Sequence, residues 1–150
     1  MPVTLQEVDL PAWEADAQVR LDLVRIYADA PAERLPLPVD AFIDQHLAAG
    51  HRFSCARFND RLLGAVAVTL GPEARWLSHL CVRKTTRRRG VGSRLLALVS
   101  EAAYAAGQRL YADSAQLLVA DQMLLTRLGY RLTKEGDCFE LDLPPRGVQP

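Results

Sequence analysis

A short segment rich in arginine and glycine is the part of this sequence best suited to chemistry. Three successive arginines at 87–89 are followed by Gly90, Val91, Gly92 and Ser93. Glycines let the backbone approach an anion without a side-chain clash, and a helix that begins here presents unpaired amide N–H groups and a partial positive charge. The segment therefore predicts a cradle for a phosphate or diphosphate group.

The charges around this segment also favour an anionic ligand. The chain has 18 basic and 18 acidic residues, yet no acid lies between Glu73 and Glu101. This local positive field suits one polyanionic ligand and not general adhesion to nucleic acid. Few aromatic side chains lie beside it for bases to stack on, so we predict no nucleic-acid partner. The basic residues of the stretch are Arg75, Arg83, Lys84, Arg87, Arg88, Arg89 and Arg94.

Two common nucleotide-binding motifs do not fit this segment. The Walker loop is absent, and residue 95 is Leu where the dinucleotide fingerprint requires Gly. What remains is Arg87-x-x-Gly90-x-Gly92 between an expected strand and a long helix, which resembles the acetyl-CoA signature of the GNAT N-acetyltransferase superfamily. The resemblance implies an α/β (α+β) fold with a mixed, mostly antiparallel sheet, helices on both faces, and splayed fourth and fifth strands.

The superfamily resemblance also implies a cofactor and its contacts. Residues 77–82 stand in the place of the fourth strand, whose exposed backbone pairs with the pantetheine arm in such folds, and residues 128–130 match a late turn of the family. The implied cofactor is acetyl-CoA or CoA. Its implied binding residues are Leu80, Cys81, Val82, Thr86, Arg87, Arg88, Arg89, Gly90, Val91, Gly92 and Ser93.

A closer resemblance lies in residues 56–63, 68–70 and 86–92, which are similar to the PanM/PanZ group of small GNAT-fold proteins. It implies an acetyl-CoA-bound regulator that docks on aspartate 1-decarboxylase (PanD), promotes its self-cleavage and tunes pantothenate synthesis. It also implies a docking edge, although the same residues suit an ordinary hairpin equally well. The longer N-terminal region, with two expected helices, departs from the group. The residues of the implied edge are Arg57, Phe58 and Asn59.

The usual groups for acetyl transfer are missing from their expected places. Transfer to an amine needs a base and an acid. No carboxylate lies between residues 74 and 100, and Leu125 stands where the tyrosine acid of the family usually sits. We therefore predict no catalytic residues, with His79 as the fallback base, although a lone histidine beside a strand is more often a packed residue. An active N-acetyltransferase is the alternative function.

The elements that must position these residues follow from the apolar periodicity. Asn59-Asp60 suits a tight hairpin turn, and three strands joined by short turns predict an antiparallel meander. We expect one domain over residues 1–143 and a loose tail over 144–150. The expected strands are 3–8, 52–58, 61–70, 75–82, 109–113 and a final pair that turns at 135–137. The expected helices are 12–28, 39–49, a long helix that follows the glycines at 90–92 and continues to 107, and 119–128.

The remaining features of the sequence predict ordinary structural roles. Cys55, Cys81 and Cys138 are odd in number and far apart, which predicts reduced, mostly buried thiols. No histidine pair has metal-ligand spacing, so we expect no metal. The chain lacks an apolar run of about 20 residues and an export signal, which predicts a cytoplasmic protein without a membrane partner. Trp13 and Trp76 are expected to anchor the core.

Overall fold

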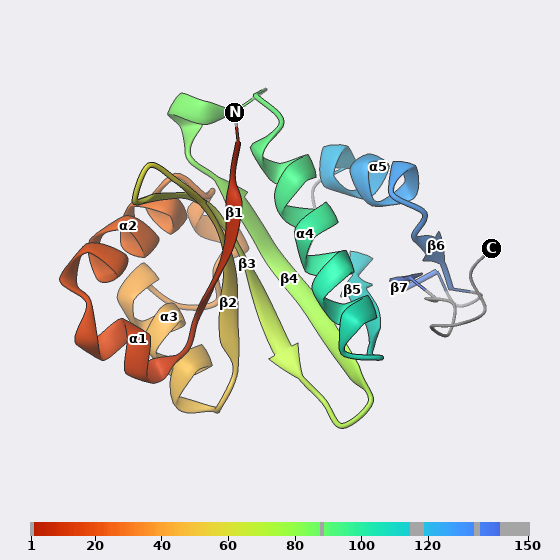
Figure 1. The fold of residues 1–150 in the computed structure, drawn as a ribbon, viewed down its shortest axis with the longest axis horizontal. Coiled ribbons are helices and arrows are strands. Elements are labelled where there is room, and N and C mark those ends of the chain that lie inside the picture. Colours follow the sequence, from red (N-terminus) through yellow and green to blue (C-terminus); the bar gives the residue numbers. More distant parts are fainter. Residues whose placement is uncertain (1, 88, 115–118, 134–135, 142–150) are drawn as a thin grey trace.

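The computed structural model describes residues 2–87, 89–114, 119–133 and 136–141. Within these ranges, seven strands form one sheet with the order β1-β2-β3-β4-β5-β7-β6, and helices pack on both of its faces (Figure 1). Only the pair β4–β5 is parallel among the described strands. The predicted fold class is therefore confirmed.

The bounds of the elements agree closely with the periodicity. The strands are β1 Thr4–Val8, β2 Arg52–Phe58, β3 Arg61–Leu70, β4 Ala74–Val82, β5 Arg109–Asp113, β6 Arg131–Leu132 and β7 Cys138–Leu141. The helices are α1 Leu10–Ala15, α2 Ala17–Ala28, α3 Val39–Ala48, α4 Val91–Ala105 and α5 Val119–Arg127, with 3-10 turns at Ala32–Arg34 and Lys84–Thr86. Arg88 and the expected tail 144–150 lie outside the described residues.

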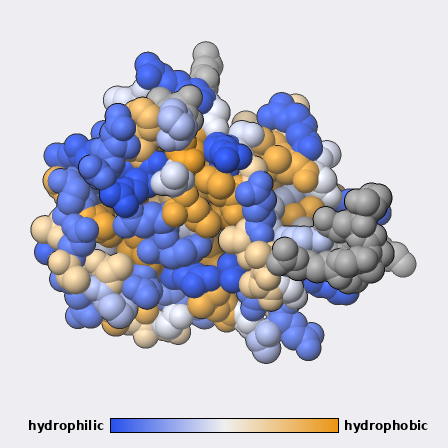
Figure 2. Space-filling view, viewed as in Figure 1, coloured by the Kyte–Doolittle hydropathy of each residue, from blue (hydrophilic) through white to orange (hydrophobic). Residues whose placement is uncertain are grey.

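Two apolar clusters lie on opposite sides of the sheet. In β3, Val66 and Val68 belong to the cluster that packs against α4, whereas Ala65 and Ala67 belong to the cluster under α2 and α3. This alternation explains why residues 62–68 of β3 form an uninterrupted apolar run, because both faces of the strand are covered there. Apolar residues also reach the surface in a band between the two helical layers (Figure 2).

The single helix predicted over 12–28 is wrong, because the structure divides it into α1 and α2. Asp16, between them, has extended backbone angles, and its carboxylate accepts hydrogen bonds from the N–H groups of Gln18 and Val19. Its own N–H donates to Ala12 O and closes α1. An aspartate that caps a helix in this way competes with a continuous helical backbone, and an apolar periodicity does not record it.

Trp76 is not the core anchor that was expected. Its side chain is 41% exposed and stacks on Tyr111 with ring centroids 4.7 Å apart. Leu77 beside it takes the face packed against α4, so alternation along β4 turns Trp76 to the opposite face. The prediction of mostly buried thiols is confirmed, because Cys55 and Cys81 are buried; all three cysteines are free. In the described part of the chain, no helix is long and apolar enough to span a membrane.

Candidate cofactor-binding site

β4 parts from its parallel neighbour halfway along its length. It pairs with β5 from Ala74 to Leu77, whereas its later residues pair, within the described chain, only with β3. This is the splay implied by the superfamily resemblance. Among the described residues, no strand pairs on the β5 side with three predicted cofactor residues: Leu80, Cys81 and Val82.

A β-bulge marks the point at which β4 turns away. Ala65 and Ala67 of β3 face Cys81 and Ser78, so the one β3 residue between them opposes two residues of β4. His79, the first of these two, has a left-handed φ of 53°. Such a backbone is uncommon for a residue with a Cβ and persists only where the surrounding contacts enforce it.

His79 is held by contacts from two helices. The Tyr27 hydroxyl donates to His79 O at 2.8 Å, and the ring lies 4.9 Å from that of Phe42. Its Nδ1 is 2.9 Å from Ser78 Oγ. Burial, together with the nearby charge of Arg34, lowers the pKa of His79 below its ordinary value of 6.5. The imidazole is therefore neutral at pH 7, which a general base requires.

The side chains at the end of β4 are turned into the protein. The Cys81 thiol donates to Ile26 O at 3.2 Å, and burial raises its pKa. Leu80 and Val82 pack against the cluster that includes α4. The buried Cys81 therefore offers a ligand its backbone, whereas Leu80 and Val82 are half-buried.

α4 begins at a glycine and has no side-chain cap. Gly90 is the N-cap residue with a left-handed φ of 79°; among the described residues it has no side-chain cap hydrogen bond, and the first turn has no acidic residue. Val91 anchors the start because its side chain is buried in the core. Among the described residues, a Cβ on Gly92 would meet only Val82 Cγ2 within 4 Å, at 3.5 Å. The first amide N–H groups of α4 therefore remain available to an anion.

Gly64 is a residue of this site that the sequence reasoning missed. A Cβ there would lie 3.3 Å from Val82 Cγ2 and 3.4 Å from Val91 Cγ1. Its bare backbone thus lets the end of β4 and the start of α4 approach β3 closely. A glycine inside an otherwise apolar strand is a signal for such an approach.

The basic residues of the site divide into two groups. Arg87 Nε donates to Val82 O, and its Nη2 donates to Asp29 O, both at 3.1 Å. The Thr86 hydroxyl likewise donates to Arg83 O within the turn. Arg89 and Ser93 are exposed, and the Arg89 guanidinium makes no hydrogen bond or ion pair with the described residues. Arg89 is therefore the described arginine of the triplet that is free to meet an anion.

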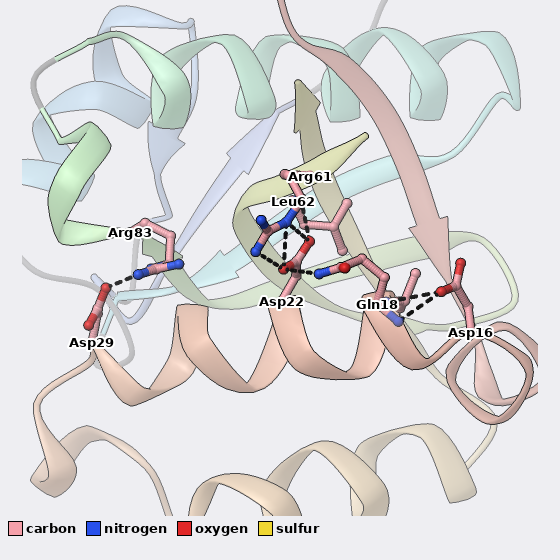
Figure 3. A network of polar contacts seen from close by, with 8 residues as sticks. Asp16, Gln18, Asp22, Asp29, Arg61, Leu62 and Arg83 are labelled. Carbon is pink, nitrogen blue, oxygen red and sulfur yellow. Dashed lines mark hydrogen bonds and ion pairs between the residues drawn. The ribbon is translucent and has the colours of Figure 1, made fainter. Parts of the chain in front are cut away.

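Asp29, at the end of α2, is the acid that the tertiary structure brings to the basic turn. Its Oδ2 accepts from Arg83 Nε at 3.1 Å (Figure 3) and from the Lys84 N–H at 3.0 Å. The Lys84 N–H and the Arg83 guanidinium hold the pKa of Asp29 below its ordinary value of 3.8. Nothing in the local sequence around Asp29 marks this role, because its partners lie more than 50 residues away.

The implied docking edge forms the turn between β2 and β3. Asn59 and Asp60 both have left-handed backbones, with φ of 49° and 63°, which confirms the predicted turn. Arg57 is exposed and forms an ion pair with Asp60, while Phe58 packs partly against the core. The polar tip and the anchored Phe58 form an exposed edge of defined shape.

A buried carboxylate on α2 supports this hairpin. Asp22, whose side chain is 2% exposed, accepts from the Arg61 guanidinium, the Gln18 amide and the Leu62 N–H at 2.7–3.1 Å (Figure 3). The sequence reasoning missed Asp22 as well. An aspartate on an otherwise apolar helix face is the signal that could have found it, since buried charges require partners.

The residue in the expected acid position is part of the core. Leu125 is 1% exposed in the cluster around α4. The nearby Tyr130 hydroxyl lies 3.1 Å from Ser100 Oγ, and burial raises the pKa of Tyr130 to about 12. Tyr130 therefore stays protonated and serves as a buried, hydrogen-bonded core residue.

A comparison with models of protein families shows which family this chain belongs to. The model of the acetyltransferase (GNAT) domain of PanZ type matches residues 8–126. The chain belongs to the PanZ family. Among curated proteins, the PanD regulatory factor of Salmonella typhimurium is 44% identical over 80 residues, which cover 53% of this chain and 55% of that protein. The chain thus spans about half the length of the curated relative that it matches.

Solved structures share the fold of this chain. The Escherichia coli protein YhhK, solved by NMR with coenzyme A bound, is 29% identical, with a TM-score of 0.62 over 95% of this chain and 100% of that one. A GNAT-family acetyltransferase from Desulfovibrio desulfuricans is 19% identical, with a TM-score of 0.71 over 95% and 100% of the two chains. The second likeness shows the GNAT fold alone.

Proposed function

We propose that this chain is an acetyl-CoA-binding regulator that docks on aspartate 1-decarboxylase (PanD) and promotes its self-cleavage, thereby tuning pantothenate synthesis. The observation that carries the proposal is the uncapped, glycine-led start of α4 beside the part of β4 that β5 leaves unpaired. The PanZ family match and the relative named PanD regulatory factor support the choice of partner.

The residues of the site fit a cofactor that carries a diphosphate. The amide N–H groups of Val91, Gly92 and Ser93 would bind its oxygens, and Arg89 would add a positive charge. On the side that β5 leaves open, the backbone of residues 80–82 would meet the pantetheine arm, with the Val82 carbonyl already engaged by Arg87. When bound, the cofactor supplies an acetyl thioester at the splay.

The docking edge in this proposal is the hairpin tip. Arg57, Phe58 and Asn59 lie on an exposed turn whose backbone is set by two left-handed residues and whose base is tied to α2 through Asp22. A pre-formed edge loses little conformational entropy on binding, which favours a specific protein contact.

One experiment tests both halves of the proposal. The protein is mixed with unprocessed aspartate decarboxylase, with and without acetyl-CoA, and complex formation and chain cleavage are followed together. We expect a complex, and faster cleavage, only when acetyl-CoA is present. Equal cleavage with and without the protein would refute the regulatory role, and unchanged thermal unfolding in saturating acetyl-CoA would refute the cofactor.

An active N-acetyltransferase is the second candidate, and one observation favours it. His79 lies at the bulge beside the splay, and burial keeps its imidazole neutral near pH 7. Release of CoA with a simple amine at about 1 per second or faster, lost in His79→Gln, would support this candidate over a purely regulatory protein.

A further inference from the structure

The turn between β4 and α4 is tethered to the rest of the protein largely through one residue. Within the described chain, the Asp29 carboxylate binds Arg83 Nε and the Lys84 N–H, and the Asp29 carbonyl binds Arg87 Nη2. The Arg83 N–H donates separately to Leu63 O at 2.9 Å. Asp29 thus contacts the turn at three successive points before the glycines begin.

The position of Asp29 is unfavourable for the helix that carries it. Asp29 is the C-cap of α2, and the carboxyl end of a helix carries a partial negative charge that disfavours an acid there. Its carboxylate also reduces the positive field that would attract an anionic cofactor. An acid with these two costs is best explained by the contacts that it makes to the turn.

We propose that Asp29 is a positioning residue for the cofactor loop. It holds Arg83, Lys84 and Arg87 so that the turn delivers the α4 amides to one place, and Arg87 acts as a strut between α2 and β4. The inference rests on the proposed cofactor site, because only a ligand of that loop can report its position.

Two physical interpretations of Asp29 predict opposite results. If its charge alone mattered, Asp29→Asn would strengthen CoA binding, because a negative charge near an anion would be removed. If it positions the loop, Asp29→Asn and Asp29→Ala weaken CoA binding by roughly tenfold, on the scale of a lost charge-assisted hydrogen bond. Asp29→Glu, which keeps the carboxylate, should recover most of the affinity.

The test measures CoA affinity by titration calorimetry alongside the stability of each variant in urea. Asp22→Asn is the matched control, because it weakens a carboxylate network two turns earlier on the same helix (Figure 3). We expect it to lower stability while changing CoA affinity by less than about twofold. Circular dichroism establishes that each variant is folded.

The outcomes separate this inference from the proposed function. If the unaltered protein takes up no CoA, the cofactor site itself is refuted. If it binds CoA and Asp29→Asn binds equally or more tightly, the positioning role is refuted while the cofactor site stands. If Asp22→Asn loses as much affinity as Asp29→Asn, the effect is general destabilisation and the inference fails.

Discussion

Replacing Asp22 by alanine tests whether α2 supports the β2–β3 hairpin. The substitution removes the acceptor of three groups at once: the Arg61 guanidinium, the Gln18 amide and the Leu62 N–H. The first two groups reach solvent and can bind water instead. The Leu62 N–H cannot, because Leu62 is only 4% exposed.

The expected cost follows from this difference in exposure. A buried N–H left without an acceptor costs about 1–3 kcal/mol. The better helix propensity of alanine returns roughly 0.5 kcal/mol, so we expect a net loss of about 1.5 kcal/mol. For a chain of this size, that loss lowers the melting temperature by roughly 3–6 °C.

The pH dependence gives the same prediction a second test. Burial alone would raise the pKa of Asp22, but hydrogen bonds from Arg61, Leu62 and Gln18 outweigh it and hold the pKa below its ordinary value of 3.8. Because the folded pKa is the lower one, the stabilisation is complete above the unfolded pKa and is lost as the pH falls through the folded value.

Urea unfolding at several pH values is the assay. The stability gap between the unaltered protein and Asp22→Ala should be constant from about pH 5 to 8 and should shrink below about pH 4. A gap under about 0.5 kcal/mol at pH 7, or one that does not shrink on acidification, would refute this account of the hairpin.

The remaining predictions concern the cofactor and the partner. Gly90→Val and Gly92→Val should abolish the thermal stabilisation by acetyl-CoA, which is about 2.7 kcal/mol at a hundredfold excess over Kd, while Arg89→Ala should only reduce it. Thermal shift measurements test this prediction. Normal binding by the glycine variants would show that the diphosphate does not bind at this loop. Asn59→Ala should remove acetyl-CoA-dependent association with the decarboxylase without changing acetyl-CoA affinity. Size-exclusion chromatography measures the association and calorimetry the affinity. An intact complex would exclude this edge as the docking site. His79→Gln should leave association unchanged, because His79 is held inside the fold by α2 and α3, whereas loss of the complex would make it part of the interface.

Local signals accounted for most of the fold and for part of the candidate site. Strand alternation, the Asn59-Asp60 turn and the glycines before α4 each act within a few residues, so their structural outcome is encoded where they stand. The break at Asp16 escaped the apolar pattern because a capping hydrogen bond depends on one side chain and not on periodicity. The exposure of Trp76 escaped it because neighbouring composition does not record which face of a strand is covered.

By itself, the sequence determined the order of elements, the glycine-led helix start and the basic stretch that suits an anion. Only the tertiary structure decided which of these charges are free. In the sequence, nothing distinguishes Arg83 and Arg87 from Arg89. In the structure, the first two bind Asp29, from which they are separated by 54 and 58 residues in the sequence. The attraction between two charges depends on their distance in space and not on their separation in the sequence. Folding brings Asp29 and Asp22 to partners that no local sequence pattern predicts.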